Sequence, residues 1–436
     1  MAALRTRWQQ SPALTTIETL LAVGVLVLGL GGLARVGPTL LRGPEQNDFL
    51  KYYQAAHALN VGQPLYQALA PVAGDEAASY NYVGAPLKYN YLYPPFLAAL
   101  LRPLAILPLP LAKAVWYVLN LVFLVAAVVL VGRVVGVVRL WSVAELLLLT
   151  LLLPAVYDTL SLGQVNLLIL LLIAAAWYCV SRRPRRTGGE LFIGCLIGVA
   201  AIIKVYPLLL GSVLLVHRRF AALGALIMSI AVLGLGGIMW GGGWHTTQTY
   251  LQEVLPNTGK SFITSPQNQN IQAALYRLFA PNVFRFAALS ATNLVTVASK
   301  PLANVPELGI ALGHIGAAAI ALITGAVVVR GSSRQQDRRT ELLDWSCILT
   351  MLLLITPITW DHYYVLLVPP AAMLWYDRRE DGGPRPLALL GAALLILLQR
   401  YWHWTALHSS SPLLMMFGCL GVLVIWLATL RGRLSC

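Results

Sequence analysis

The sequence holds little charge for its length. Only 11% of its 436 residues are charged, whereas a soluble globular chain carries about a quarter. Acidic residues are scarcest, 17 against 31 lysines and arginines, while 58% of the chain is hydrophobic. Its apolar runs reach membrane length and do not alternate with polar residues as barrel strands do. The composition excludes a soluble protein and predicts an all-α polytopic membrane protein.

Cysteine is also scarce. The five cysteines lie in or beside apolar segments, without a CxxC spacing or a histidine partner. This predicts small buried residues, with no disulfide frame and no metal site. The HExxH, Walker and GxSxG motifs are absent, so metalloprotease, P-loop and nucleophile-elbow chemistry have no support. We expect neither a metal nor a cofactor.

The basic residues that are present gather in short clusters between the apolar runs. The clusters are Arg5/Arg7, Arg133/Arg139, Arg182–Arg186, His217–Arg219, Arg330–Arg339, Arg378–Arg385 and Arg431/Arg433. This distribution follows the positive-inside rule, so the net charge of +14 indicates topology and no nucleic-acid partner. If every cluster is cytoplasmic, an even number of crossings separates each from the next.

The apolar runs fit that topology with about twelve transmembrane helices and both termini in the cytoplasm. We expect spans near 16–36, 110–132, 142–157, 164–181, 190–204, 205–217, 220–240, 306–330, 341–356, 362–376, 386–402 and 412–430. Two long outer loops then cover about 37–92 and 241–305. The whole chain, 1–436, is interpreted as a single transmembrane domain.

The segment 89–110, with the sequence YNYLYPPFLAALLRPLAILPLP, does not fit as a full span. Counting it as a crossing would invert the side of every later arginine cluster. Its prolines and Arg102 also interrupt a helix. We expect a re-entrant or broken hairpin from the outer face, a structure tolerated only where protein covers it or it lines a cavity.

The unusual polar residues fall on the outer side of this topology. They are Asp48, Asp158, Gln164, Asn166, Lys204, Asn268, Asn270, Trp360, Asp361 and His362. The cytoplasmic connections are short and basic, with little beyond Arg, Ser, Gly and Pro. Any chemistry is therefore expected on the non-cytoplasmic face.

Asp48 begins a predicted amphipathic helix over about 47–60. A rare carboxylate at the membrane edge favours a chemical role. Aspartate is equally a favoured helix N-cap, and the spacing leaves both interpretations open. Tyr52, in the same helix, fits an aromatic of the interface belt.

Lys204 is the one charge in the apolar stretch AAIIKVYPLLL. A charge in or at the edge of a span is energetically unfavourable and marks a function or a partner, although lysines near span ends also extend to the headgroups. We favour anion binding, with phosphate as the anion.

Three further sites have a structural and a functional interpretation each. Gln164 lies in a turn that opens a helix, where an anion site or a plain turn is possible, and the plain turn is favoured. Asn268 and Arg277 fit a cap and an anchor, or ligands for sugar hydroxyls and phosphate. Trp360 and His362 fit a membrane-interface belt, or a stacking surface and a phosphate donor.

Six segments follow one another in an order that resembles glycosyltransferase family 87. They are NDFLKYYQAAHALNVGQPLY, YLYPPF with RPLAILP, LGQVNLL, IKVYPLLL with HRR, the QNQN loop with its arginine, and TPITWDHY. The resemblance covers roughly residues 45–375. Members are GT-C membrane glycosyltransferases, including polyprenol-phosphate-mannose-dependent mannosyltransferases of actinobacterial phosphatidylinositol mannosides.

The resemblance implies a GT-C fold in a plasma (inner) membrane. It also implies inverting transfer of a sugar, with mannose the family-based expectation, from a polyprenyl-phosphate donor to a lipid or glycan acceptor at the outer leaflet. No nucleotide or obligatory metal takes part. Asp48 would be the general base, and Lys204, His362 and, more weakly, Arg277 would bind the leaving phosphate.

The resemblance also assigns ligands for the sugar and the acceptor. Gln164, Asn268 and Trp360 would hold the sugar, with Tyr52 and Asp361 as further candidates at the acceptor. In the family the residue after the tryptophan is commonly not acidic. Asp361 is therefore a rival to Asp48 as the base, or a partner that holds His362.

Two alternatives remain open at this point. A transporter or lipid flippase also uses lone intramembrane charges and broken helices, although the halves of this chain show no obvious repeat. A non-catalytic membrane subunit would use Asp48 merely as a cap.

Overall fold

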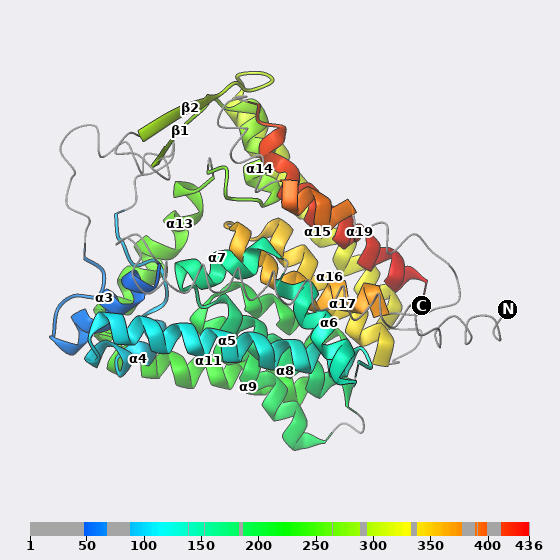
Figure 1. Cartoon of the computed structure of the whole chain (residues 1–436), viewed down its shortest axis with the longest axis horizontal. Coiled ribbons are helices and arrows are strands. Elements are labelled where there is room, and N and C mark those ends of the chain that lie inside the picture. The colour runs from blue at the N-terminus through cyan, green and yellow to red at the C-terminus, as the bar shows by residue number, and fades with distance from the viewer. Residues whose placement is uncertain are drawn as a thin grey trace.

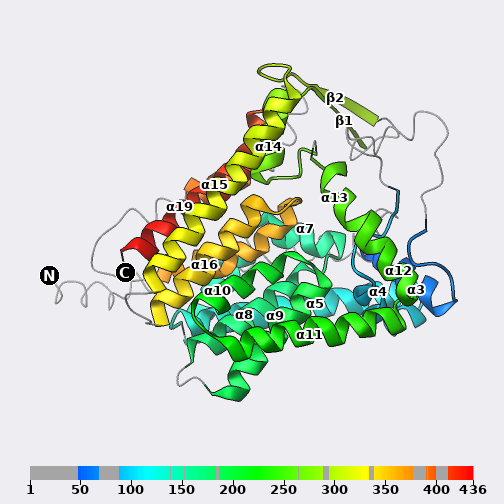
Figure 2. The ribbon, with the colours of Figure 1, turned by 180° about the vertical axis from the view of Figure 1, so that it is seen from behind.

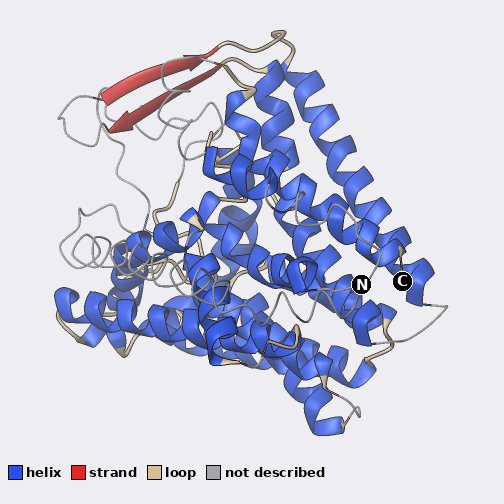
Figure 3. Ribbon diagram, turned by 45° about the vertical axis from the view of Figure 1, so that its right-hand side comes forward, coloured by secondary structure: helices blue, strands red, loops and turns tan. Residues whose placement is uncertain are grey.

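The computed structural model describes residues 48–67, 88–137, 139–151, 153–182, 186–263, 265–287, 294–332, 338–376, 389, 391–398 and 411–435. The expected first span, 16–36, lies outside these residues, as does part of the span at 386–402. The described chain is helical apart from one antiparallel hairpin, β1 (Asn282–Ala287) with β2 (Leu294–Ser299). Figure 3 shows this hairpin at one edge of the helices.

The helices coincide with the apolar runs of the sequence. They are α5 (Leu109–Val134), α6 (Leu140–Leu151), α7 (Pro154–Leu162), α8 (Asn166–Ser181), α9 (Thr187–Ile203), α10 (Gly211–Val216), α11 (Phe220–Trp240), α15 (Pro306–Ser332), α16 (Arg338–Ile355), α17 (Val368–Tyr376) and α19 (Phe417–Leu434). Two 3-10 helices, η3 (Tyr206–Leu210) and η5 (Asp361–Leu367), lead into α10 and α17.

Four helices of the described part are long and apolar enough to cross a membrane, namely α5, α11, α15 and the helix ending at Leu434. A fifth crossing arises if α6 and α7, bent by 69°, act as one span. The apolar helices α8 and α9 have 16 and 17 residues, below the about 20 that a hydrocarbon core needs. The structure supports a polytopic helical membrane protein, and the count of about twelve crossings stays a prediction.

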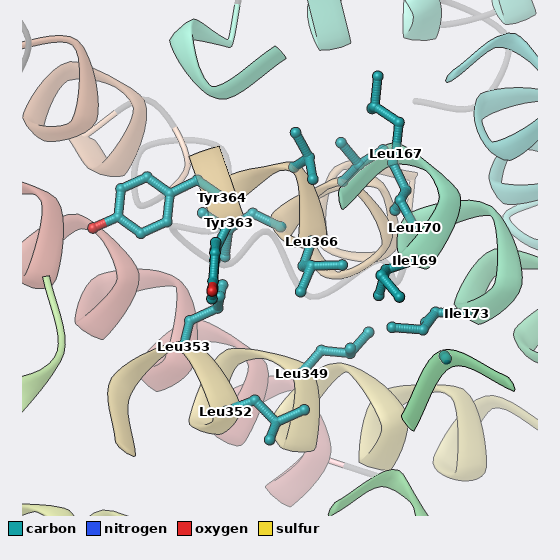
Figure 4. Close-up of a cluster of buried hydrophobic side chains, with 14 of the residues drawn as sticks. Leu167, Ile169, Leu170, Ile173, Leu349, Leu352, Leu353, Tyr363, Tyr364 and Leu366 are labelled. Atoms are coloured by element: carbon teal, nitrogen blue, oxygen red, sulfur yellow. The ribbon is translucent and has the colours of Figure 1, made fainter. Parts of the chain in front are cut away.

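The helices form two groups joined by α16 (Figure 1, and from behind in Figure 2). In one group α8 packs between α5 and α9, and α9 packs on α11. In the other, α15 and α19 lie against each other, and α16 contacts both of them as well as α8. Apolar side chains of α8, α16 and η5 fill the junction, among them Ile169, Leu353 and Leu366 (Figure 4).

Glycines allow α9 and α11 to approach closely. A Cβ atom on Gly194 would lie 2.0 Å from the carbonyl oxygen of Ala222, and one on Gly198 would lie 2.6 Å from the Cβ of Ser229. Small residues at such contacts are typical of helix pairs in membranes, because dispersion contacts must there replace a hydrophobic driving force. The close contact fixes the end of α9, where Lys204 follows.

The segment 89–110, expected to form a broken hairpin, contains several short elements. It contains α4 (Pro95–Leu101), the 3-10 helix η2 (Leu104–Ile106) and an extended residue, Leu107, before α5 begins. Prolines stand at both helix starts, where the missing amide proton costs no internal hydrogen bond. Its entry from the outer face of a membrane stays a prediction.

The stretch expected as a second long loop, 241–305, is largely folded. It contains α12 (Gly243–Thr249), a π-helix (Tyr250–Val254), α13 (Leu255–Ser261), α14 (Ile271–Phe279) and the β1–β2 hairpin. α14 packs on a glycine face of α15, where a Cβ on Gly313 would lie 3.0 Å from the Cα of Gln272. The position of this stretch on the outer side of a membrane stays a prediction.

Candidate active site

Asp48 is the first described residue of α3 (Asp48–Asn60), which coincides with the helix expected over about 47–60. Its carboxylate is held at both oxygens. Lys51 Nζ, one turn further along α3, donates to Oδ1 at 2.7 Å, and Gln164 Nε2 donates to Oδ2 at 2.5 Å. The Asp48 side chain keeps 18% of its surface exposed. It is therefore oriented by the protein and still within reach of a ligand.

The apolar face of α3 anchors Asp48 to the bundle. Phe49 is buried and stacks on Trp116 of α5, with 5.7 Å between ring centroids. Trp116 Nε1 in turn donates to the carbonyl of Gly163 at 2.7 Å. The start of α3 is thus tied to the turn that joins α7 to α8.

Gln164 lies in that turn. Gly163 ends α7 with φ of 66°, a left-handed conformation that favours glycine, and the Gln164 amide donates to Thr159 O at 2.8 Å. The Gln164 side chain is buried, and its Oε1 accepts from Tyr52 Oη at 2.7 Å and from Tyr93 Oη at 3.2 Å. These contacts direct its amide nitrogen at Asp48.

Lys204 follows the last residue of α9 and is 4% exposed. Its Nζ donates to Asn166 Oδ1 at 2.7 Å and lies 4.0 Å from the centroid of the Tyr363 ring. Among the described residues no carboxylate forms an ion pair with Lys204, although the charge of Asp48 acts on it at longer range. A buried ammonium with a neutral amide and an aromatic face as partners can still accept an anion.

His362 lies in the first turn of η5. Its carbonyl accepts from Asn166 Nδ2 at 3.1 Å and from Thr159 Oγ1 at 3.2 Å, which fixes the backbone. Within the described chain the buried His362 Nε2 has no hydrogen-bond partner. The charges of Lys204 and Asp48 both act on its ring. His362 therefore joins the same cluster with one ring nitrogen available.

Asp48 lies outside the membrane-spanning helices, and its surroundings set its protonation. Burial raises the pKa of the Asp48 carboxyl, while the Lys51 ammonium, the charge of His362 and the hydrogen bond from Gln164 lower it. The lowering effects prevail, so the pKa lies below the ordinary aspartate value. The group is a carboxylate at neutral pH.

Arg277 and Asn268 are engaged by the protein itself. Arg277 Nη1 donates to the carbonyls of Ser265 and Asn268 at 2.6 and 2.8 Å. Asn268 Nδ2 donates to Pro357 O at 3.1 Å, and its Oδ1 accepts from Thr359 N at 2.9 Å. Both side chains are fully buried and tie the 265–270 loop to the turn before Trp360. Their expected contacts with phosphate and sugar play no part in the function proposed below.

Trp360 and Asp361 lie at the start of η5. The half-buried Trp360 ring stacks near His362, with 6.4 Å between centroids, and packs on Phe262 at 4.9 Å. The charge of Asp361 acts on Arg277 and Tyr364. The charge of Asp48 acts on both Lys204 and His362.

Sequence reasoning gave no role to three neighbours of this cluster, namely Lys51, Tyr93 and Asn166. The i,i+3 spacing from Asp48 could have identified Lys51, because such residues meet on a helix. Tyr93 carried no comparable signal, since its contact with Gln164 joins segments 71 residues apart.

Comparisons with known proteins point to one family. A family model described as glycosyltransferase family 87 matches residues 91–357, more than half of the chain. Gln164 and Lys204 lie inside that range, His362 lies five residues after its end, and Asp48 lies 43 residues before its start.

Two characterised relatives are similar over parts of their length. One is a polyprenol-phosphate-mannose-dependent alpha-(1-2)-phosphatidylinositol pentamannoside mannosyltransferase of Mycobacterium tuberculosis, 27% identical over 64% of this chain and 62% of that protein. The other is an alpha-(1->3)-arabinofuranosyltransferase of Corynebacterium glutamicum, 29% identical over 44% of this chain and 41% of that protein. The chain thus spans less than two thirds of either relative.

Proposed function

The chain belongs to glycosyltransferase family 87, and from that premise we propose that it transfers a sugar from a polyprenyl-phosphate donor to a lipid or glycan acceptor. The observation that carries this proposal is the grouping of Asp48, Lys204 and His362, from three separate segments, around the 163–166 turn. Gln164 of this turn donates to the Asp48 carboxylate. Asn166 contacts both Lys204 Nζ and the His362 carbonyl. The grouping combines an ionised carboxylate with a buried ammonium and a histidine nitrogen that has no partner in the described chain. A base and a phosphate site are the two requirements of this reaction.

Asp48 acts as the general base. An acceptor hydroxyl donates its hydrogen bond to the carboxylate, and the proton moves to Asp48 as the oxygen attacks the anomeric carbon. A bond forms between that oxygen and the anomeric carbon. The bond from the anomeric carbon to the phosphate oxygen breaks on the opposite side, and its electron pair leaves with the polyprenyl phosphate. The configuration of the sugar inverts.

Lys204 and His362 receive the leaving group. A phosphate monoester leaves without protonation when cationic and hydrogen-bonding groups stabilise its developing charge. Within the described part of the chain, Lys204 Nζ donates its hydrogen bond to the neutral Asn166 amide. His362 Nε2 supplies a further hydrogen bond. Because both groups are buried, their interaction with phosphate is stronger than it would be in water.

Trp360 supports recognition of the sugar. Its half-buried ring lies beside His362 and is braced by Phe262. An aromatic face next to a polar group suits a pyranose, which has an apolar face and a rim of hydroxyls. Mannose is the favoured sugar because the mycobacterial relative is named for a polyprenol-phosphate-mannose donor.

The outer leaflet is the favoured side. Glu190, near the start of α9, pairs with Arg219, whereas Lys204 follows the end of the same helix. Fourteen residues of helix separate them by about 21 Å. The cluster therefore lies toward the helix ends opposite the arginines. With the arginines on the cytoplasmic side, it opens to the other side of a plasma membrane.

The decisive experiment supplies the purified protein with polyprenyl-phosphate sugars and a membrane-lipid extract, and follows products by mass spectrometry. We expect a product heavier by one sugar, with release of polyprenyl phosphate. Asp48→Asn should lower the rate by about 10²–10⁴-fold, the usual contribution of a positioned base, while the fold and donor binding persist. Asp158→Asn is the matched control and should retain transfer.

Two outcomes would contradict the proposal. Full transfer by Asp48→Asn would exclude Asp48 as the base. Donor movement across proteoliposomes with no covalent product from any donor would replace the enzyme with a transporter.

A further inference from the structure

Two amide side chains of one turn contact the two chemically different halves of the candidate active site. Gln164 donates to the Asp48 carboxylate at 2.5 Å. Two residues later, Asn166 Oδ1 accepts from Lys204 Nζ at 2.7 Å, and Asn166 Nδ2 donates to His362 O at 3.1 Å. Four consecutive residues, 163–166, therefore link the base to the phosphate-binding groups by hydrogen bonds.

Gln164 has only one orientation that satisfies its neighbours. Tyrosine hydroxyls donate to its Oε1 from two elements, Tyr52 on α3 and Tyr93 ahead of α4. A flipped amide would direct its N–H groups at those hydroxyls and its oxygen at the Asp48 carboxylate, which repels it. The side chain is 2% exposed, so water cannot easily compensate such a flip.

Asn166 is oriented just as firmly. Its oxygen accepts from a cation and its nitrogen donates to a carbonyl, so a flip would lose both contacts. The side chain has no exposed surface, and the residue begins α8, whose apolar residues pack into the core. The 163–166 turn is thus a rigid part of the bundle.

We propose that this turn fixes the distance and direction between the general base and the phosphate-binding groups, with Gln164 and Asn166 as its positioning residues. The inference rests on the proposed function. An in-line displacement needs the attacking oxygen, the anomeric carbon and the leaving oxygen aligned, and a misplacement of about 1 Å lowers the rate about 10²-fold. Asp48 and Lys204 lie on separate elements that this turn links.

The contact of Asp48 with Lys51 cannot provide the same alignment. Lys51 belongs to the same helix as Asp48, and its side chain is 36% exposed. This ion pair therefore orients Asp48 within α3. Gln164, 116 residues away and buried, relates α3 to the rest of the site.

The pH profile separates positioning of the base from direct contact with sugar. The Gln164 hydrogen bond favours ionised Asp48, so its removal moves the acid limb of kcat/KM to higher pH. The titratable groups that act on Asp48 or that its charge reaches are Lys51, Tyr52, Tyr93, Lys204, His362 and Tyr363. All of them remain in a Gln164→Ala variant.

The test compares Gln164→Ala, Asn166→Ala and the exposed control Gln252→Ala in the full-length enzyme, with polyprenyl-phosphate mannose as the donor. Gln164→Ala should lower kcat by about 10–100-fold, the usual effect of losing a residue that orients a functional group. Its donor KM should stay within about threefold, with the acid limb shifted upward. Asn166→Ala should raise donor KM by about tenfold with the acid limb unchanged, since it orients Lys204. Gln252→Ala should match the wild type.

A milder variant covers the case in which Gln164→Ala does not fold. Tyr52→Phe removes one hydroxyl that orients the Gln164 amide and leaves the ring in place. By itself Tyr52→Phe should lower kcat by about 3–10-fold, leave donor KM unchanged and shift the acid limb of kcat/KM upward, a readout that does not need Gln164→Ala to fold. Where Gln164→Ala folds, adding Tyr52→Phe to it should lower kcat by much less, because the two side chains act as one unit.

Specific results would overturn the inference. A Gln164→Ala enzyme with a wild-type pH profile and a raised donor KM would make Gln164 a sugar ligand. Additive effects of Tyr52→Phe and Gln164→Ala on kcat would show that Tyr52 does not act through Gln164. If Asp48→Asn is inactive while Gln164→Ala is fully active, this inference fails and the proposed function stands; transfer by Asp48→Asn overturns both.

Discussion

The two ends of α9 carry buried polar clusters of opposite character. At its start lies the arginine cluster, in which Arg219 pairs with both Glu190 and Glu341. Nearby, Asp344 accepts from Arg433 and lies 2.8 Å from His217 Nε2. At its end lies the candidate active site, where the buried Lys204 contacts a neutral amide and His362 Nε2 has no partner in the described chain.

This difference indicates that the arginine cluster stabilises the fold, whereas the candidate active site is suited to bind a ligand. In the arginine cluster, Arg219, just before α11, pairs with carboxylates of α9 and α16, so opposite charges meet within the protein. The Arg219 charge therefore has carboxylate partners of its own, although Glu190 Oε2 has no hydrogen-bond partner in the described chain. The candidate active site instead holds a buried lysine without a carboxylate partner in the described chain, an arrangement in which an anionic ligand stabilises the ammonium form.

The sharpest test introduces methionine at each end of α9, in two separate variants. Arg219→Met leaves two buried carboxylates without their cation, and breaking such a pair lowers the free energy of unfolding by about 3–5 kcal/mol. We expect a large fall in the thermal unfolding temperature in detergent. Arg218→Met, at the exposed neighbouring residue, is the control. An unfolding temperature close to wild type for Arg219→Met would contradict a stabilising role.

Lys204→Met should lower donor affinity without lowering the unfolding temperature. Replacing a buried cation that lacks a carboxylate partner by an apolar side chain keeps or raises the unfolding temperature. Donor affinity should fall by about 10–10²-fold, since a charge-assisted contact with phosphate contributes about 1.5–3 kcal/mol. Binding of a labelled polyprenyl phosphate measures this loss. Unchanged affinity would show that the phosphate lies elsewhere.

His362→Phe tests the second phosphate donor. The ring contacts with Trp360 and Tyr363 can persist, while the Nε2 hydrogen bond is lost. We expect kcat/KM for the donor to fall by about tenfold, with little change in unfolding temperature. A large loss of stability without a kinetic effect would show that His362 stabilises the fold, as the arginine cluster does, and does not bind phosphate.

The smallest expected effect concerns pH. Asp48 must be ionised to act as the base, and its pKa lies below the ordinary value, so kcat/KM should persist on acidification to about pH 4. Lys51→Met removes the ammonium that lowers this pKa, so the acid limb should move upward. An acid limb near pH 6 in the wild type would contradict Asp48 as the titrating group.

The sequence alone predicted the helical membrane protein and the positions of most helices, α3 among them. These features are local, because the length and apolarity of a run set a membrane helix, and a cap or a proline sets its ends. The ordered motifs also indicated the family, since each motif is a short stretch of chain. Lys204 was identifiable as one charge in an apolar segment.

Only the tertiary structure decided what each polar side chain contacts. An amide in a loop has the same sequence signal whether it faces a sugar or a backbone carbonyl, and packing assigned Asn268 to Thr359 and Gln164 to Asp48. Arg277 was directed at main-chain carbonyls for the same reason. Such contacts join segments about 90–116 residues apart or close a loop on its own helix, and they depend on how the helices pack.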